Sequence, residues 1–467
     1  MISSLPMASA AAPAAPATPD FRSPAWLRAH ARDCLAFWAS KGAPSGGLFH
    51  CLRDDGSVYD PRCRHLVSST RLVVQWAWAV SHKLAPLPAP APSYRSLLDS
   101  CLAFLRERHL NAATGGYRWV VVVDDEAPAG AAAGRAAGAA PGPVEAADDS
   151  NRSYGLCFAL LAYSSALAAG HEECRAMVDE VTATLTQRFW SEEHVLYADE
   201  ASGDWAVLDR YRGQNANMHA CEAHMAAFRA TGGALHLARA RAIAHAMCVR
   251  QAARVDAAVG LGALVYEHYG PDWEPDFAFN ADKPNDRFRP HGFQPGHLLE
   301  WAKLLVQLDS LGALEADGAT PAAWRLAAAR RFFEAALLGW DEGGAGAAGG
   351  SAGGFVYSLR PERGLPLGNR LKYKWVQTEG AAAAALLAHA PGIDAEGRAF
   401  YLAQYDRIWR LSWAHFVDHR HGSWFRVLGA DLSAVDDLKC PPGKVDYHAT
   451  GLCYDAAEAF QAAAATP

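Results

Sequence analysis

The chain has 467 residues, of which 51% are hydrophobic and 20% are charged, so it carries enough apolar side chains for a large core. Its formal net charge of -7 leaves no basic surplus for a phosphate backbone, and we expect no nucleic-acid partner. No apolar run approaches the roughly 20 residues that cross a bilayer, so we expect no membrane association either.

Residues 1–22 are rich in Ala and Pro and lack the basic start and continuous apolar stretch of a signal peptide. We expect a disordered extension there. The ten cysteines farther along are scattered without a CxxC pair, which is typical of reduced thiols in a core. Both features favour a cytoplasmic protein.

A short pattern then recurs six times: a glycine, followed by aromatic and β-branched residues, followed by an acidic or glycine-containing turn. Each copy predicts a small β-hairpin or an extended pair of segments around a turn. The copies lie roughly 65–90 residues apart, which indicates a structural repeat. They are centred near Gly47, Gly116, Tyr197, Gly262, Gly354 and Gly422.

Apolar residues between the hairpins repeat at helical spacing, as do Leu98, Cys101, Leu102 and Leu105. One helix precedes the first hairpin, two lie between each successive pair, and one follows the last, which makes about twelve helices. Twelve helices in six antiparallel pairs predict an all-α (α/α)6 barrel, a closed ring in which every pair buries its faces against its neighbours. We expect one barrel domain over residues 23–467.

Three stretches interrupt the repeat. Residues 127–147 are almost entirely Ala, Gly and Pro, and we expect a flexible insertion there. Residues 340–354 are rich in Gly and Ala and predict a flexible turn. Residues 266–296 hold aromatic and charged side chains without periodicity, and a long loop of that kind is more often functional than not.

Helices that directly follow a hairpin all run in the same direction, so their N-terminal turns must meet at one end of the ring. These turns carry an unusual set of polar and aromatic residues, which predicts a functional site at that end. The set comprises Arg71, Tyr154, Asn215, His219, His297, Glu300, Trp375, Glu379 and His448. No HExxH or P-loop motif accompanies it, and we expect neither a metal ion nor another cofactor.

Histidines in such a set suit proton transfer at C2 of an open-chain sugar. The pKa of an unperturbed imidazole, about 6.5, lies near working pH, so a histidine can remove this proton. Arg71 can hold the negative charge of the enediolate, and Trp375 offers a flat face to a sugar. Structural alternatives stay open. His219, His448 and Trp375 can be packing residues, His297 can cap a helix, and the charge of Arg71 can belong to a buried ion pair.

The chain resembles the N-acylglucosamine 2-epimerase superfamily, which includes cellobiose 2-epimerases and mannose isomerases, from about Trp26 onward. The resemblance is most specific in the segments STRLVVQWAWA, NANMHACEA, FQPGHLLEWAKLL, KWVQTEGAAAA and DYHATG. It implies the same (α/α)6 fold and no metal or redox cofactor.

The resemblance also implies roles for individual residues. The two acid/base histidines of the family match His297 and His448, and its enediolate-stabilising arginine matches Arg71. An arginine that the irregular loop contributes in the isomerase branch matches Arg287. The sugar-binding residues of the family match Asn215, His219, Glu300, Trp375 and Glu379.

Isomerases and epimerases share the removal of the C2 proton and differ in where a proton returns. Return to C1 gives a ketose, whereas return to the opposite face of C2 gives the 2-epimer. The segment HGFQPGHLLEWAKLL and the spacing of Arg287 look closest to the isomerase branch, so we predict conversion of D-mannose to D-fructose. The alternative is 2-epimerisation of a free sugar. Lys444 and Val67, where some relatives have glutamine and an aromatic residue, leave the exact sugar open.

Two other classes of protein are compatible with a toroid of this kind. Glycoside hydrolases rely on paired carboxylates around the cleaved bond, whereas the predicted site holds more histidine than acid. A non-catalytic sugar-binding module needs no pair of proton donors. In each case the partner is a small mono- or disaccharide, and we expect a monomer or a homodimer.

Overall fold

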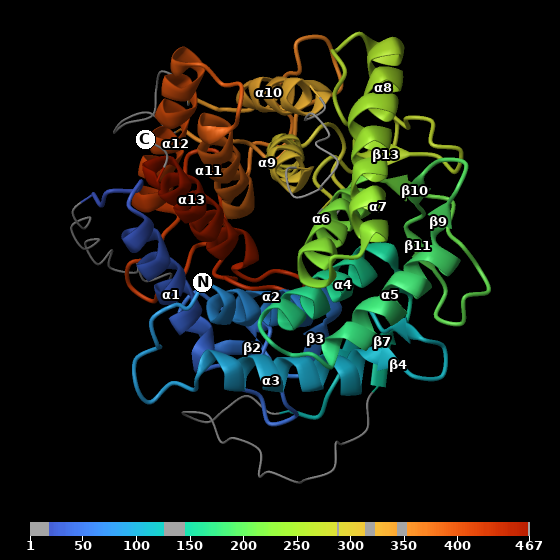
Figure 1. The fold of residues 1–467 in the computed structure, drawn as a ribbon, viewed down its shortest axis with the longest axis vertical. Helices are drawn as coiled ribbons and strands as arrows, with labels where there is room; N and C mark the ends of the chain where they lie inside the picture. The colour runs from blue at the N-terminus through green and yellow to red at the C-terminus, as the bar shows by residue number, and fades with distance from the viewer. Residues whose placement is uncertain (1–17, 126–144, 287–288, 313–322, 343–352, 466–467) are drawn as a thin grey trace, which may run out of the picture.

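The computed structural model describes residues 18–125, 145–286, 289–312, 323–342 and 353–465, and in these residues twelve helices form an inner and an outer ring (Figure 1). The inner ring consists of α2 (Leu66–Ser81), α4 (Ser153–Ala168), α6 (Gln214–Thr231), α9 (Pro295–Gly312), α11 (Lys374–His389) and α13 (Tyr447–Ala465). The outer ring consists of α1 (Pro24–Ala39), α3 (Tyr94–Phe104) with η1 (Leu105–His109), α5 (Cys174–Arg188), α7 (Ala234–His245) continued by η2 (Ala246–Gln251) and α8 (Ala252–Val259), α10 (Ala323–Leu337) and α12 (Ala395–His415). This is the predicted (α/α)6 barrel.

The two rings follow from two kinds of helix. Each inner helix contacts two inner neighbours and packs mainly on one outer helix, and α13 closes the ring on α2. The inner helix α4 is accordingly apolar and buried almost throughout. The outer helix α5 buries only one stripe, formed by Cys174, Val178, Val181, Thr182 and Leu185, as expected for a helix with one solvent face. None of the described helices is both long and apolar enough to cross a bilayer.

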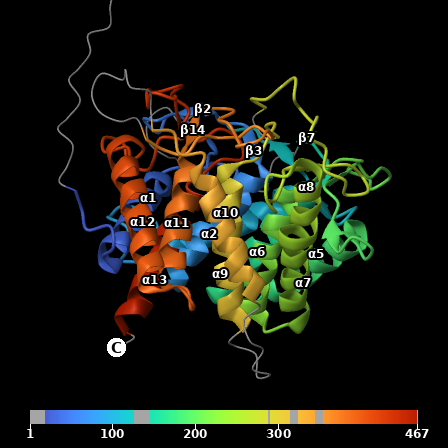
Figure 2. The same ribbon diagram turned by 90° about the horizontal axis from the view of Figure 1, so that it is seen from above.

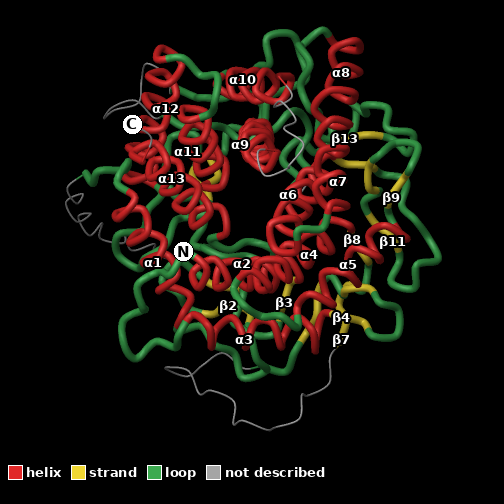
Figure 3. Tube along the Cα trace, viewed as in Figure 1, coloured by secondary structure: helices red, strands yellow, loops and turns green. Residues whose placement is uncertain are grey.

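Short strands and loops gather at one end of the barrel (Figure 2), and they are drawn in yellow and green in Figure 3. Three antiparallel pairs are local hairpins close to predicted positions. They are β1 (Cys51–Leu52) with β2 (Val58–Asp60), β4 (Leu110–Asn111) with β5 (Gly116–Tyr117), and β9 (Trp190–Ser191) with β10 (Leu196–Tyr197).

Four other pairings join neighbouring repeats, which the sequence did not predict. They are β3 (Cys63–His65) with β6 (Val120–Val122), β8 (Asn151–Arg152) with β11 (Glu200–Ala201), β12 (Arg212–Gly213) with β13 (His268–Tyr269), and β14 (Lys372–Tyr373) with β15 (Val427–Leu428). The first strand of each pair leads directly into an inner helix. Single antiparallel bridges lie near two further predicted positions, Trp340 with Phe355 and Val417 with Trp424, so the pairings between repeats add to the predicted local pairs. These pairings connect neighbouring repeats at the end of the barrel where the inner helices begin.

Two predicted boundaries differ from the structure. Glu145–Asp148 form β7, which pairs with β6, so the end of the insertion predicted at 127–147 is ordered, while residues 127–144 lie outside the described residues. Phe21 and Arg22, which we assigned to the disordered extension, pack on α12. The Phe21 ring stacks on Trp409 with 5.2 Å between ring centroids, and Arg22 pairs with Asp406 at 2.7 Å. Residues 1–17, and residues 343–352 of the turn predicted at 340–354, also lie outside the described residues.

Several histidines are buried in the fold with a lowered pKa. Burial brings the pKa of His30, His109 and His219 to about 4, and it is also the largest cause of the lowered pKa of His50, His65, His224 and His448. The unfolded chain binds protons at these sites below pH 6.5, before the folded chain does. Each histidine therefore contributes stability that is present above pH 6.5 and decreases by up to about 1.4 kcal/mol per pH unit as the pH falls toward its folded pKa.

Three buried carboxyl groups act in the opposite direction. Burial raises the pKa of Asp199 and Asp455 to about 7 and that of Glu300 well above its usual value, so these groups bind protons in the folded state first. Because the histidines outnumber them, we predict a net loss of unfolding free energy between about pH 6.5 and pH 4. Urea denaturation at several pH values measures it. Equal unfolding free energies at pH 7 and pH 5 would contradict the prediction.

Candidate active site

A cavity opens at the end of the barrel where the inner helices begin, and all six inner helices contribute to its lining. Eight of the ten residues predicted for the site line it, namely Arg71, Tyr154, Asn215, His219, His297, Glu300, Trp375 and His448. Glu379 lies behind this lining, and Arg287 lies outside the described residues. The shared direction of the inner helices thus brings residues from six repeats to one place, as expected.

His297 lies in the first turn of α9, and a carboxylate fixes its orientation. Its Nδ1 is 2.8 Å from Oε2 of Glu267, which also accepts a hydrogen bond of 3.0 Å from the Gln214 side chain. Trp301 in turn donates to Oε1 of Gln214 at 2.8 Å, which sets the direction of that amide. Because an ionised carboxylate only accepts hydrogen bonds, Nδ1 of His297 carries the proton. The other nitrogen, Nε2, then has the lone pair that a base needs.

His448 in α13 is held in the same way from the neighbouring helix α11. Its Nδ1 is 2.7 Å from Oε1 of Glu379, and Oε2 of Glu379 is 2.7 Å from Nζ of Lys303. Burial, together with the positive charges of Arg71 and Lys303, holds the pKa of His448 well below its usual value, so the imidazole is neutral at neutral pH. Glu379, which we predicted as a sugar contact, instead lies behind this histidine, 2% exposed.

Trp375 lies beside both histidines, which places them in one site. Its ring centroid lies 5.0 Å from that of His297 and 5.7 Å from that of His448, with an interplanar angle of 40° in both cases. A Cβ atom on Gly296 would lie 2.4 Å from the Trp375 ring, so this position in α9 has room for glycine only. Residues 151 positions apart in the chain thus share one aromatic neighbour, within reach of a single small molecule.

Arg71 is buried without an ion pair among the described residues, so the structural alternative for this residue is wrong. Its guanidinium lies 4.4 Å from the Phe158 ring centroid and 4.9 Å from that of Tyr447. It donates to the Tyr154 hydroxyl at 3.2 Å and to the Gly443 carbonyl at 3.5 Å. Aromatic faces and neutral acceptors hold the cation without neutralising it. Its charge therefore stays available to an anion that forms in the cavity.

His219 and Glu300 form a second polar group in the lining. Nδ1 of His219 is 2.9 Å from Glu222, which also accepts a hydrogen bond from the Tyr447 hydroxyl. Burial lowers the pKa of His219 to about 4 despite this carboxylate, and burial and the like charge of Glu379 raise the pKa of Glu300 well above its usual value. This shift favours the protonated form of Glu300, which can donate a hydrogen bond. Its Oε1 lies 3.9 Å from Nε2 of His219, too far for a hydrogen bond between them.

Three buried oxygen atoms of the lining have no hydrogen-bond partner among the described residues. They are Oδ1 of Asn215, Oε1 of Gln294 and Oε1 of Glu300. Buried polar atoms are nearly always paired, because an unpaired one costs about 1–3 kcal/mol. A ligand with several hydroxyl groups supplies such partners. The cavity is therefore suited to a polyhydroxylated molecule.

Several residues of the site could not be recognised in the sequence. Glu267 contacts His297, and Lys303 contacts the carboxylate of Glu379, from distant parts of the chain, and no local motif marks them. Glu222 lies three residues after His219 in α6, and only this helical spacing marks it. Arg289 also lines the cavity, with its guanidinium 4.0 Å from the Tyr211 ring centroid. The one signal for Arg289 is its place in the irregular loop that we expected to be functional.

Comparison with known proteins adds independent information. The family model described as N-acylglucosamine 2-epimerase (GlcNAc 2-epimerase) matches residues 47–452. A D-mannose isomerase of Marinomonas mediterranea is 37% identical over 439 residues, which cover 94% of this chain and 98% of the relative. A D-mannose isomerase of Thermobifida fusca is 35% identical over 302 residues, which cover 64% of this chain and 65% of the relative.

Solved structures show the same likeness. A crystal structure of a D-mannose isomerase superposes with a TM-score of 0.80 at 37% identity, covering 95% of this chain and 100% of the other. A cellobiose 2-epimerase from Spirochaeta thermophila superposes with a TM-score of 0.73 at 19% identity, covering 96% of this chain and 100% of the other. The second likeness shows a common fold alone.

Proposed function

Because the chain belongs to the N-acylglucosamine 2-epimerase family, we propose that it is an aldose–ketose isomerase that converts D-mannose to D-fructose. The relatives from Marinomonas mediterranea and Thermobifida fusca both have the name D-mannose isomerase, and the first aligns over nearly the whole of both chains. The observation that carries the proposal is the pair of carboxylate-bound imidazoles, His297 and His448, on either side of Trp375 in one cavity.

The reaction begins with the open-chain form of the aldose, which has a carbonyl at C1 and an acidic hydrogen at C2. Nε2 of one histidine removes the C2 proton, and the electron pair of the broken C–H bond forms the C1–C2 double bond. The C1 carbonyl oxygen gains the negative charge, which is stabilised by Arg71, the cation held by the rings of Phe158 and Tyr447. A proton then returns from the imidazole to C1, and the hydroxyl proton of O2 moves to O1. The product has a carbonyl at C2 and two hydrogens on C1.

The remaining polar residues of the lining bind the hydroxyl groups of the sugar. Protonated Glu300 donates a hydrogen bond, and Oδ1 of Asn215 and Oε1 of Gln294 accept one each. Trp375 packs against the carbon skeleton between the two histidines. These contacts hold C1 and C2 beside a base, which is the largest requirement for a proton transfer.

The alternative within the family is 2-epimerisation, for which the same two histidines act on opposite faces of C2. Hydrolysis of a glycoside is less compatible with the site. Glu267, which lines the cavity, is hydrogen-bonded to His297, and Glu222, behind the lining, to His219, so these two carboxylates are not placed as a pair around a bond to be cleaved.

Incubation with sugars in D2O, followed by NMR, tests the proposal. We expect D-mannose and D-fructose to interconvert, with deuterium entering C1 of fructose and C2 of mannose. Formation of glucose with deuterium at C2 would show 2-epimerisation instead. Turnover of N-acetylglucosamine or cellobiose without turnover of mannose would overturn the choice of substrate, and a protein that binds mannose without any exchange would be a binding module.

A further inference from the structure

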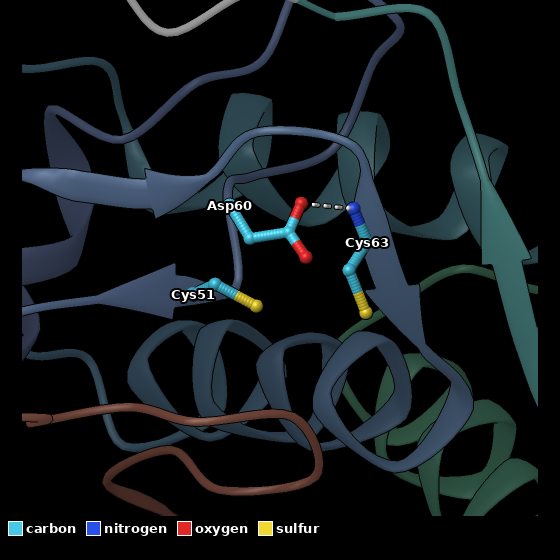
Figure 4. A group of neighbouring side chains, drawn as sticks. All are labelled: Cys51, Asp60 and Cys63. Atoms are coloured by element: carbon cyan, nitrogen blue, oxygen red, sulfur yellow. Dashed lines mark hydrogen bonds between the residues drawn. The ribbon is translucent and has the colours of Figure 1, made fainter.

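A second group of chemically active side chains lies away from the cavity, at the first hairpin. Cys51 belongs to β1, Asp60 ends β2, and Cys63 begins β3. One sulfur atom from each cysteine and one carboxylate oxygen of Asp60 all lie within 4.8 Å of one another. Figure 4 shows both thiol groups and the free carboxylate oxygen directed toward a common space. None of the three residues lines the cavity of the candidate active site.

The hairpin builds this group from its register and its turn. Cys51 and Asp60 are directly opposite each other in the antiparallel pair of β1 and β2. Oδ1 of Asp60 accepts hydrogen bonds from the backbone N–H groups of Arg62, at 3.0 Å, and Cys63, at 3.1 Å. These two bonds turn the chain back on itself, so that Cys63 comes to lie beside Cys51. The other carboxylate oxygen of Asp60 stays on the side of the sulfur atoms (Figure 4).

We propose that Cys51, Asp60 and Cys63 bind a soft divalent cation, of which Zn²⁺ is the best match. Two thiolates and one carboxylate are common zinc ligands, and three protein ligands leave a fourth tetrahedral position for water. Water can enter, since Asp60 and Cys63 are only half-buried, whereas Cys51 is buried.

The charges around the group favour a cation. All three side chains become negative on losing a proton, and at this separation their negative charges repel one another. The guanidinium of Arg64 donates to Asp125 at 2.6 Å and to the backbone carbonyls of Pro61, at 2.7 Å, and Cys63, at 3.1 Å. Among the described residues it makes no hydrogen bond to either thiol. A bound divalent cation removes the repulsion and holds the thiols as thiolates.

A disulfide is the competing use of two neighbouring thiols. Both cysteines are free in the structure, and the carboxylate of Asp60 lies beside them. A nearby negative charge disfavours the thiolate that attacks in disulfide exchange, and the carboxylate has no role in the oxidised pair. The presence of Asp60 thus favours a metal site.

The site joins segments that lead to the catalytic end of the barrel. β3 ends at His65, whose Nδ1 accepts the backbone N–H of Val67 and so caps α2, the helix of Arg71. Leu52 of β1 pairs with Cys440, in the loop that leads to α13. Because the cation would hold β1 to the turn before β3, we expect it to stabilise the fold and to take no part in the sugar reaction.

Cobalt binding tests the proposal directly. The full chain is reduced, freed of metal with a chelator, and titrated with Co²⁺ and then Zn²⁺. We expect one Co²⁺ per chain, with a near-ultraviolet thiolate-to-cobalt absorption band that Zn²⁺ abolishes. Cys63→Ser should lose the band, whereas Cys174→Ser, which removes a buried thiol outside the group, should retain it. Zn²⁺ should raise the melting temperature of the wild type by about 3 °C or more and leave that of Cys63→Ser unchanged.

Asp60→Asn keeps both thiols and covers the case in which Cys63→Ser does not fold. This variant should bind Co²⁺ at least about 10-fold more weakly than the wild type. A reduced wild-type chain that gives no thiolate-to-cobalt band would overturn the proposal. So would a Cys51–Cys63 disulfide that forms equally in the presence and absence of Zn²⁺. Sugar turnover by the metal-free chain is expected, and its loss on metal removal would place the cation in the reaction instead.

Discussion

Replacement of His297 by alanine is expected to lower kcat for interconversion of mannose and fructose by about 10²–10⁴-fold, and replacement of His448 by a similar factor. Each imidazole is a base held by one carboxylate at Nδ1, and alanine removes that base. Steady-state kinetics measures the loss. The melting temperature shows whether the variant is folded.

His30→Ala is the matched control for removal of a buried histidine. His30 accepts a hydrogen bond of 3.0 Å from the indole of Trp424 and lies in the outer helix α1, away from the cavity. We expect this variant to lose stability and to keep its kcat. If His297→Ala and His448→Ala turn mannose over at nearly the wild-type rate, the proposed chemistry is wrong.

Isotope exchange in the same variants assigns the base. A histidine variant that forms no ketose but still exchanges the C2 hydrogen of mannose with D2O retains the histidine that removes this proton. If His448→Ala exchanges and His297→Ala does not, His297 is the base and His448 acts later. Loss of exchange in both variants would show that deprotonation needs both side chains.

The ring of helices was predictable from the sequence because it rests on local signals. Glycine-containing turns recur at a regular interval, and apolar residues between them repeat at helical spacing, so the order of helices follows without knowledge of long-range contacts. The pairing of strands was not predictable. Two-residue strands such as β8 and β12 carry almost no pattern, and their partners are set by the closure of the ring.

The site shows the same difference between features set by local signals and features set by long-range contacts. Residues in the first turns of the inner helices could be placed at one cavity because helix direction alone determines their end of the barrel. Glu267 could not be placed at the cavity from the sequence, because it lies on a loop 30 positions before His297 and contacts it only through tertiary packing. Nothing in the sequence distinguishes Lys303 from an exposed lysine of a helix, and only the structure shows that it is buried against Glu379. Cys51 and Cys63 likewise become neighbours only through the hairpin register.

The two histidines of the site are not equivalent. The carboxylate behind His297 is held by the neutral amide of Gln214, whereas the carboxylate behind His448 is held by the cation of Lys303. Burial and the positive charges of Arg71 and Lys303 hold the pKa of His448 well below its usual value, which makes this imidazole a weak base. We therefore expect His297 to remove the C2 proton from mannose.

Glu267→Gln and Glu379→Gln are therefore expected to lower kcat strongly, by about 10²–10⁴-fold, without removing either imidazole. An amide can donate a hydrogen bond to Nδ1, which stabilises the tautomer with the proton on Nε2, and that tautomer cannot act as a base toward the sugar. In Glu379→Gln the lost negative charge also lowers the pKa of His448 further, and an NMR titration of its imidazole measures this shift. Steady-state kinetics measures the loss of kcat.

A matched control for the loss of a carboxylate is Glu362→Gln, because Glu362 is an exposed partner of Arg360, does not line the cavity and should leave kcat and the titration of His448 unchanged. Lys303→Met separates the effect of the His448 tautomer from the effect of the charge beside Glu379. It keeps Glu379 on Nδ1 of His448 but removes the cation behind it, so the pKa of His448 in the NMR titration should rise, opposite to the shift in Glu379→Gln. A purely structural role of these residues predicts lower stability and no such pair of opposed shifts. An unchanged pKa of His448 in folded Glu379→Gln and Lys303→Met would show that the carboxylate only packs against the histidine.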